Sequence, residues 1–307
     1  MPITMSIKII KQGLSDRIVD MGRYGYQDLG IQPSGPMDYL SAQLANLIID
    51  NAPGHPVIEL HFPAGVLEFD ATMYICISGA NFVPIINEKS VVNNRPIKVG
   101  PKDQLRFLQP INGRTAYLAF KGTVATENKW LNSYSSFQTT LQKDTIIDIT
   151  PAPIDTITFN ANKADLVQRV QSCLFNEHTI RFIPGPAWND LDANSIQQLL
   201  EKPFSIDPKS NRMGFLLNGP KLHLSRPKQY LSAAVTKGTL QLLPNGHIII
   251  LMADHQTIGG YANLGQIILV DLPRFAQFNQ QCQFKLSLTN VQTAHQLYRS
   301  TQSWFNH

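Results

Sequence analysis

Short extended runs separated by turn residues are the feature that most restricts the fold of this chain. Seven such runs follow one another between residues 57 and 120, bounded by Gly, Pro, Asn or Asp. Short strands at these intervals are typical of a β-barrel or a β-sandwich. We therefore expect a mainly β chain with a few helices. The expected strands are residues 57–60, 66–69, 73–78, 83–87, 97–99, 104–108 and 116–120.

A few segments have the pattern of helices instead. Asp38 is a suitable N-cap for a helix that begins beside it, and the apolar residues of that helix share one face. These residues are Leu40, Leu44, Leu47 and Ile48. Further helices are expected at residues 193–201 and 291–300.

Length and composition bound the domain organisation. A chain of 307 residues with 43% hydrophobic and 16% charged residues is globular and long enough for two modest domains. Residues 156–177 are polar and lack periodicity, so we expect the boundary there. The predicted domains are residues 1–177 and 178–307.

Charge, hydropathy and cysteine usage argue against several classes of protein. The 26 basic and 22 acidic residues are spread along the chain without a Lys/Arg block, so we expect no nucleic-acid partner. No apolar run has the length of a membrane span, and the N-terminus lacks a signal-peptide pattern. Three widely separated cysteines indicate reduced thiols, and the expected location is cytoplasmic.

The stretch at residues 240–271 gathers the most chemistry. A buried strand is expected at residues 248–253, and the run ADHQTIGGY at residues 253–261 follows it. A second apolar run at residues 267–270 is typical of another extended segment. Gly259 and Gly260 allow backbone angles closed to other residues and a close approach to a ligand. The residues alone leave two interpretations open: a binding site at the end of a strand, or a β-hairpin with a polar loop.

A second shaped loop lies near the N-terminus. Residues 19–38 contain four glycines and two prolines, which is typical of a loop rather than a helix or strand. Within it, Arg23 offers a planar cation suited to a carboxylate or phosphate, or it holds the loop by pairing with Asp20 or Asp28. A triad of Ser34, Asp38 and His255 can be drawn, but no local pattern supports it.

Several motifs are absent from the sequence. There is no GxxxxGK[ST], GxGxxG, HExxH or GxSxG, and no glycine is followed by lysine. A P-loop phosphate cradle is therefore excluded, and we expect no metal site because the histidines lack zinc-ligand spacing. No Met-Lys pair occurs, so biotin is not expected to be attached to this chain.

Four ordered stretches resemble one family. They are GRYGYQ with PSGPMD at residues 22–38, LAN with IEL at residues 44–60, SNRMG at residues 210–214, and GTLQ with LMADHQTIGGY at residues 238–261. This pattern is similar to the biotin-dependent carboxyltransferase family that includes the C subunit of 5-oxoprolinase, the KipI antagonist (KipA) and the matching half of the urea amidolyase carboxyltransferase domain. The resemblance covers roughly residues 7–295.

The resemblance implies a fold of two cyclophilin-like β-barrel subdomains. It also implies hydrolysis of 5-oxo-L-proline to L-glutamate by a heteromeric complex that uses ATP. The implied partners are the A subunit of 5-oxoprolinase together with a KipI-like B subunit, and the substrate is a small lactam or amide.

The resemblance and the needs of lactam opening together select the candidate site residues. Developing negative charge calls for cationic or N–H donors, and a carboxylate is needed to handle a proton. We therefore predict Asp254 and Thr257 as catalytic residues. The predicted substrate-binding residues are Arg23, Arg212, Gln256, Gly259, Gly260, Tyr261 and Ser34.

Two other functions stay open. One is a non-catalytic regulatory protein that antagonises a KipI-like partner. The other is the carboxyltransferase of a biotin-dependent urea or amide carboxylase, which requires a separate biotin carrier.

Overall fold

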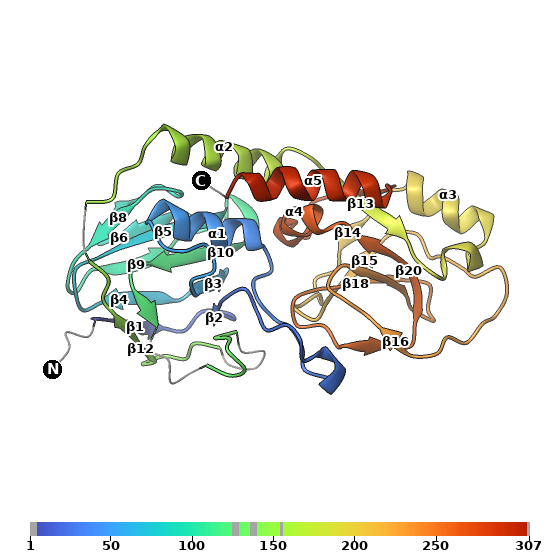
Figure 1. The fold of residues 1–307 in the computed structure, drawn as a ribbon, viewed down its shortest axis with the longest axis horizontal. Coiled ribbons are helices and arrows are strands. Elements are labelled where there is room, and N and C mark those ends of the chain that lie inside the picture. The colour runs from blue at the N-terminus through green and yellow to red at the C-terminus, as the bar shows by residue number, and fades with distance from the viewer. Residues whose placement is uncertain (1–4, 125–128, 136–139, 154–155, 306–307) are drawn as a thin grey trace. The chain divides into compact units, whose positions relative to one another are not determined.

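The computed structural model describes residues 5–124, 129–135, 140–153 and 156–305. These residues form two compact units. The first unit comprises Met1–Arg23 and Ser34–Cys173, and the second comprises Tyr24–Pro33 and Leu174–His307. Both are mainly β with a few helices, as predicted, and their sheets curl in the manner of partial barrels (Figure 1).

The first unit contains two sheets among its described residues. Antiparallel pairing gives the orders β11-β12-β1-β4-β9-β6-β7 and β2-β3-β10-β5-β8. The longer strands are β1 (Met5–Lys11), β3 (Val57–His61), β4 (Val66–Phe69), β5 (Met73–Asn81), β9 (Gln104–Phe107), β10 (Asn112–Phe120) and β12 (Ile146–Thr150). The shorter ones are β2 (Arg17–Val19), β6 (Pro84–Ile86), β7 (Lys89–Ser90), β8 (Ile97–Val99) and β11 (Thr123–Val124).

Side-chain alternation along these strands separates a core face from a helix-covered face. Leu118 and Phe120 of β10 belong to the buried hydrophobic cluster between the strands. Tyr117 points to the other face, as period-two alternation requires, and helix α1 (Tyr39–Ile48) packs on β10 and β5 (Figure 1). The predicted N-cap is confirmed, because Asp38 accepts a hydrogen bond from Ser41 N at 3.0 Å.

The second unit is built on one large sheet of order β14-β15-β18-β17-β20-β13-β21. A separate two-stranded ribbon consists of β16 (Ala233–Ala234) and β19 (Ile258–Gly259). The strands of the large sheet are β13 (Thr179–Pro184), β14 (Ser205–Ile206), β15 (Gly214–Asn218), β17 (Thr239–Leu242), β18 (Ile248–Leu251), β20 (Ala262–Ile267) and β21 (Lys285–Leu288). The helices are α3 (Ala193–Glu201), α4 (Leu272–Gln277) and α5 (Val291–Ser303).

The predicted helix at residues 193–201 is confirmed as α3, and the tail helix is confirmed with three further residues as α5. The apolar run at residues 267–270 differs from the expectation. Only Ile267 lies in a strand, and the chain then forms a 3₁₀ turn (Leu269–Asp271) that leads into α4. Asp271 is fully buried and binds Arg181 through two side-chain hydrogen bonds, which anchors this turn.

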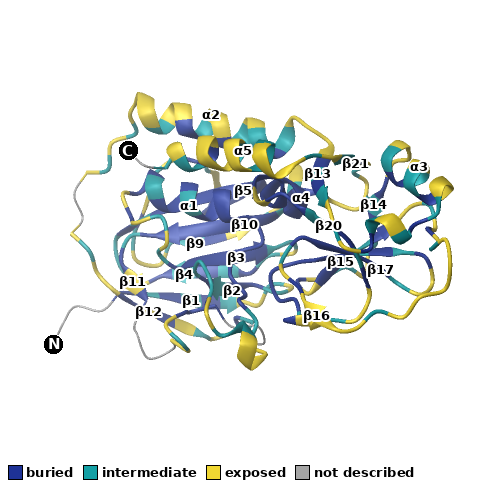
Figure 2. Ribbon diagram, turned by 45° about the vertical axis from the view of Figure 1, so that its right-hand side comes forward, coloured by how far each residue is buried: buried dark blue, intermediate teal, exposed yellow. Residues whose placement is uncertain are grey.

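The polar segment at residues 156–177, where we expect the domain boundary, contains a helix that its weak periodicity did not predict. This helix, α2 (Ala161–Phe175), is largely exposed (Figure 2). Its buried apolar positions are Leu166, Val170 and Leu174, a stripe with a spacing of four residues. Asn160 caps its first turn by accepting from Lys163 N at 3.0 Å. This narrow stripe is the side of α2 that is buried, while most of its other residues meet water.

Candidate active site

The loop after β18, residues 252–257, is fixed by main-chain hydrogen bonds to the segment before β15. Met252 N donates to Met213 O at 3.0 Å, and Asp254 N donates to Arg212 O at 2.8 Å. These bonds continue the β15–β18 pairing beyond the strand ends. The backbone of Asp254 is therefore held as firmly as a strand residue.

Asp254 and Arg212 form a buried, two-pronged ion pair. Arg212 Nε donates to Asp254 Oδ2 at 2.8 Å, and Arg212 Nη2 donates to Oδ1 at 2.9 Å. The two side chains are only 8% and 6% exposed. A planar guanidinium that meets both carboxylate oxygens is the strongest geometry for such a pair. The structure therefore brings the predicted site residues Arg212 and Asp254 into direct contact with each other.

His255 lies next in the chain and is also buried. Its Nδ1 is 2.6 Å from the carbonyl oxygen of Gln256. Burial lowers the pKa of His255 below its ordinary value, which favours the neutral ring. The triad with Ser34 and Asp38 gains no support, because both carboxylate oxygens of Asp38 accept hydrogen bonds from Ser41 in the first unit.

Residues 256–261 carry the remaining predicted contacts of this loop. Thr257 is buried, and its carbonyl accepts from Val235 N at 3.0 Å, which ties the loop to the ribbon. Among the described residues, neither the Thr257 hydroxyl nor the side-chain amide of Gln256 has a hydrogen-bond partner. These groups are donors that a ligand can use.

The run ADHQTIGGY is not the loop of a simple hairpin. β18 and β20 do not pair with each other, because β17 lies between them in the sheet. The chain leaves β18, passes through β19 beside β16, and returns on the far side of β17. The glycines therefore lie in a crossing segment, and the hairpin interpretation is wrong.

A cavity of about 610 Å³ borders this crossing segment. Gly260 and the half-exposed Tyr261 form one wall of the cavity. Its lining combines aliphatic side chains, such as those of Leu222 and Leu242, with polar ones. Among the polar ones, Lys228 and Tyr230 both bind the Asp190 carboxylate. Its size is within the range of small-molecule sites in proteins.

Gln241 of β17 was not among the predicted site residues. It is 1% exposed, and neither its Oε1 nor its Nε2 has a hydrogen-bond partner among the described residues. A Cβ added to Gly259 would lie 2.5 Å from Gln241 Nε2, so β19 packs directly on this amide. The signal in the sequence was a single amide within the apolar run TLQLL at residues 239–243.

The other two predicted residues, Arg23 and Ser34, lie in the first unit. Arg23 is buried, its Nη2 donates to the carbonyl of Ser135, and its guanidinium lies 4.7 Å from the ring centroid of Trp130. Ser34 is buried in the left-handed region with φ 57°. A carbonyl and an aromatic ring therefore hold Arg23, and its pairing with Asp20 or Asp28 stays a prediction.

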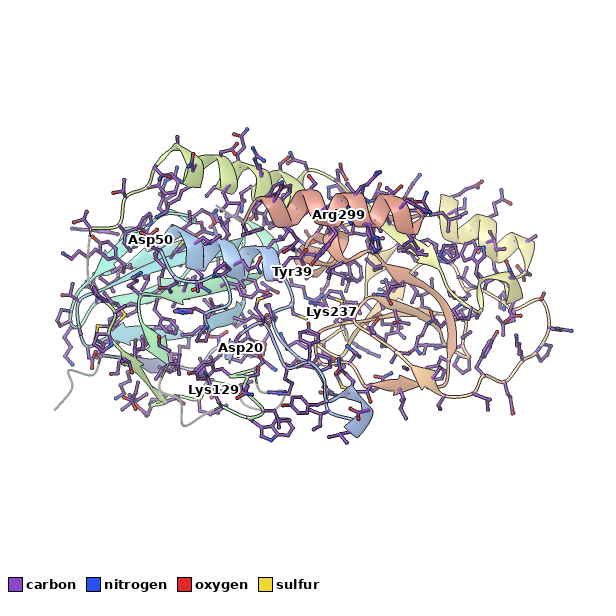
Figure 3. The ribbon with its side chains drawn as sticks, viewed as in Figure 1. Asp20, Tyr39, Asp50, Lys129, Lys237 and Arg299 are labelled. Atoms are coloured by element: carbon purple, nitrogen blue, oxygen red, sulfur yellow. The ribbon has the colours of Figure 1, made fainter. Side chains whose placement is uncertain are left out.

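Asp20 organises the loop on which Arg23 rests. Its carboxylate accepts hydrogen bonds from Ser133 Oγ at 2.5 Å, Tyr134 N at 2.8 Å and Ser135 Oγ at 2.8 Å. Figure 3 labels Asp20 and Lys129, the first residue of the described segment 129–135 that contains these three residues. Asp20 therefore fixes the backbone whose carbonyl receives Arg23.

Two buried groups hold the loop that contains Ser34. Glu59 Oε2 accepts from Met37 N at 2.9 Å, and the Tyr117 hydroxyl accepts from Asp38 N at 2.7 Å. Burial, followed by the nearby Glu59 carboxylate, raises the pKa of Tyr117 well above its ordinary value. Tyr117 therefore stays a neutral hydroxyl that donates to Glu59.

The structure thus brings seven of the nine predicted residues into one part of the second unit. They are Arg212, Asp254, Gln256, Thr257, Gly259, Gly260 and Tyr261. Arg23 and Ser34 occupy a pair of anchored loops in the first unit. Among the described residues, no group of three or more His, Cys, Asp or Glu side chains is arranged to hold a metal ion. No helix in the part of the chain that the structure describes is both long and apolar enough to cross a bilayer.

Known proteins resemble this chain in both sequence and fold. The C subunit of 5-oxoprolinase from Escherichia coli K12 is 27% identical over 282 residues, which cover 88% of this chain and 87% of that protein. The Haemophilus influenzae protein of the same name is 28% identical over 94% of this chain and 93% of its own length. Urea amidolyase from Lachancea kluyveri is 26% identical over 91% of this chain, which spans only 16% of that protein.

Solved structures agree at the level of the fold. Urea amidolyase from K. lactis superposes with a TM-score of 0.85 and 22% identity, covering 98% of this chain and 20% of that one. The crystal structure of TTHA0988 superposes with a TM-score of 0.80 and 24% identity, covering 94% of this chain and 57% of that one. The model of the family described as "Carboxyltransferase domain, subdomain A and B" matches residues 29–287. With most of its length matched, the chain belongs to this carboxyltransferase domain family.

Proposed function

We propose that this chain is a subunit of an ATP-dependent 5-oxoprolinase, which opens 5-oxo-L-proline to L-glutamate together with the A and B subunits of that enzyme. The observation that carries the proposal is the end-to-end correspondence with free-standing relatives named as the C subunit of 5-oxoprolinase, over 94% of this chain and 93% of the Haemophilus influenzae protein. The urea amidolyase relatives are far longer, and this chain corresponds to a small part of them.

The loop after β18 has the groups that such a reaction needs. Opening the ring breaks the lactam C–N bond, and negative charge develops on the carbonyl oxygen as it does so. The Thr257 hydroxyl and the Gln256 amide are donors without partners in the described structure, so they are available to that oxygen. Gly259 and Gly260 let the main chain approach a ligand closely, and Tyr261 offers a ring face at the cavity wall.

The ion pair gives Asp254 and Arg212 a shared role in this proposal. The pair locks the loop so that Gln256 and Thr257 are presented in one geometry. Asp254 can also handle a proton, as the sequence predicted, provided that one of its oxygens leaves the guanidinium fork during turnover. The proposed substrate-binding roles of Arg23 and Ser34 rest on the resemblance alone.

ATP is the co-substrate of the proposed complex. The chain has no P-loop, and none of its glycines is followed by lysine. These residues do not fit a phosphate cradle of that kind, so no step of the mechanism is derived through ATP on this chain. The proposed partners, the A and B subunits, are where we place nucleotide binding.

The urea amidolyase relatives favour one second candidate, a carboxyltransferase that acts on urea or a similar amide. That reaction requires biotin on a separate chain, because this one lacks the Met-Lys attachment pair. A third candidate, a regulatory protein that binds a KipI-like partner, predicts a stable complex without turnover.

The decisive experiment measures ATP hydrolysis that depends on 5-oxoproline, with the A and B subunits present and this chain added or omitted. Turnover that requires this chain supports the proposal. A stable complex with the B subunit in which turnover does not depend on this chain contradicts it and favours the regulatory candidate. Urea-dependent carboxylation with a biotin carrier present favours the carboxyltransferase instead.

A substitution of Thr257 tests the site within the same assay. Thr257→Val keeps the shape of the side chain and removes the hydroxyl donor. We expect kcat to fall by about 10²-fold with an unchanged fold, the size of effect seen when one oxyanion donor is removed. Thr123→Val, at the exposed position of strand β11, is the control and is expected to leave kcat unchanged. An unchanged kcat in Thr257→Val removes the hydroxyl from the mechanism.

A further inference from the structure

The Gln241 side chain has an unusual environment for a buried amide. It is 1% exposed, yet neither amide atom has a hydrogen-bond partner among the described residues. Buried polar groups are nearly always satisfied, and each unsatisfied one destabilises the fold. A residue that keeps such a group at a cost in stability is expected to use it in function.

The position of Gln241 points to the candidate site. It lies on β17 directly opposite Asn263 of β20, so the two side chains share one face of the sheet. The Asn263 Oδ1 also lacks a partner among the described residues. β19 covers Gln241, with the Cα of Gly259 close enough that an added Cβ would lie 2.5 Å from Nε2. The amide is therefore directly beneath the Gly259-Gly260 segment.

The cover over Gln241 is thin. Among the described residues, the β16–β19 ribbon has two register pairs, Ala233 with Gly259 and Ala234 with Ile258, and is extended by one main-chain hydrogen bond, from Val235 N to Thr257 O. It is a separate sheet and does not pair with the large one. Ile258 is 63% exposed, so the ribbon has no second layer above it. Moving it breaks few buried contacts, which makes it a low-cost segment to open.

The chemistry of a carboxamide specifies what it can bind. Gln241 presents one N–H donor and one C=O acceptor side by side. A five-membered lactam has its N–H and C=O on the same side of the C–N bond, and urea has the same arrangement. Either molecule can form two parallel hydrogen bonds with a carboxamide. The names of both groups of relatives refer to a substrate of this class.

We propose that Gln241 reads the H–N–C=O edge of a cyclic or small amide when the β16–β19 ribbon moves aside, and so sets specificity for amides over esters. The inference rests on the proposed function for the identity of the lactam. It does not depend on which partner supplies the rest of the site.

The test compares two ligands and two proteins. The ligands are 5-oxoproline and its lactone analogue, in which the ring N–H is replaced by oxygen. Their binding to the complex with the B subunit is measured by calorimetry for the wild type and for Gln241→Leu. The wild type is expected to bind the lactam at least about tenfold more tightly, as the loss of a hydrogen bond and an unmatched acceptor require. In Gln241→Leu this preference is expected to disappear.

Thermal unfolding separates this role from a structural one. Leucine matches the glutamine in size and removes both unsatisfied groups, so Gln241→Leu is expected to keep or raise the melting temperature. Gln43→Leu on α1 is the matched control, because Gln43 Oε1 likewise lacks a partner among the described residues. It is expected to leave the lactam preference intact.

The outcomes distinguish the inference from the proposed function. Turnover that requires this chain, with a lactam preference that survives in Gln241→Leu, overturns the inference alone. Absence of such turnover, with urea binding that weakens at least about tenfold in Gln241→Leu, overturns the proposed function and supports the inference. Failure of the wild type to bind either 5-oxoproline or urea overturns the inference as well.

Discussion

Both carboxylate oxygens of Asp254 accept hydrogen bonds from the Arg212 guanidinium, and this ion pair leads to a prediction for stability as well as for function. Asp254→Asn removes the carboxylate charge that faces the buried Arg212 guanidinium, at a site where the two side chains are 8% and 6% exposed. Breaking a buried pair in this way costs about 3–5 kcal/mol. We expect urea-induced unfolding to show a loss of that size.

A double-mutant cycle isolates the pair. Arg212→Gln combined with Asp254→Asn is expected to lose less stability than the sum of the single variants, because the double variant leaves no lone buried charge. Lys228→Gln is the control. It removes the partly exposed ion pair with Asp190 and is expected to cost under about 1 kcal/mol. Simple additivity of the two buried substitutions would contradict the role of the pair.

Asp16 makes the pH dependence of the first unit testable. Burial is the main cause that raises its pKa from 3.8 to about 6, although it accepts hydrogen bonds from His61 N and Gly65 N. A raised pKa in the folded state means that the folded protein holds the proton longer than the unfolded chain does. Stability from this group is therefore greatest below about pH 4 and falls as the pH rises to about 6, by about 3 kcal/mol.

The measurement is the free energy of unfolding between pH 4 and pH 7 for the wild type and Asp16→Asn. The wild-type value minus the variant value is expected to decrease with pH. Asp192→Asn is the control, because a hydrogen bond from Ser195 N lowers the pKa of Asp192. Its contribution is lost only as the pH falls below about 4, so the difference for this variant is expected to stay flat between pH 4 and pH 7. A flat difference for Asp16→Asn would show that this carboxyl is not perturbed.

At the scale of elements, the ribbon that carries β19 depends on Gly259. A side chain there would meet the amide of Gln241 at 2.5 Å, whereas at Gly260 the nearest atom, Ser232 Oγ, is 3.2 Å away. We expect Gly259→Ala to cost about 1–3 kcal/mol through overpacking and Gly260→Ala to cost less. Thermal unfolding of both variants checks this order. Gly259→Ala combined with Gln241→Ala is expected to recover most of the loss, and failure to recover would place the strain elsewhere.

The elements also show why sequence patterns reached some parts of the fold and not others. Helix α1 was predictable because its cap and its apolar face are local in the sequence. Helix α2 was not, because three apolar residues spaced by four are easily lost among polar ones. The ion pair of Arg212 and Asp254 joins residues 42 positions apart. Single-sequence patterns could place both residues in motifs but could not show their pairing.

At the scale of the whole molecule, the division into two units does not follow the order of the chain. The segment Tyr24–Pro33 belongs to the second unit, although the residues on either side of it belong to the first. Hydrogen bonds within the segment, such as Gly30 N to Gln27 O at 3.0 Å, form a local turn. No periodicity in the sequence indicates that this segment belongs to the second unit, because it is a loop and the rest of that unit lies far along the chain.

The place of Tyr24–Pro33 in the second unit gives a prediction for hydrogen–deuterium exchange. Phe275 is fully buried in the second unit, with ring centroids of Phe215 and Phe284 at 5.3 Å and 5.4 Å. Phe275→Ala is expected to cost about 3–5 kcal/mol. If each unit opens as its own cooperative body, exchange should rise in residues 174–305 and also in residues 24–33, while residues 34–124 keep their protection.

Phe120→Ala in the core of the first unit is the reciprocal variant, expected to raise exchange in residues 34–124 and to spare residues 24–33. A uniform rise in either variant would mean that the two units unfold as one, and protection of residues 24–33 that follows their sequence neighbours would contradict their place in the second unit.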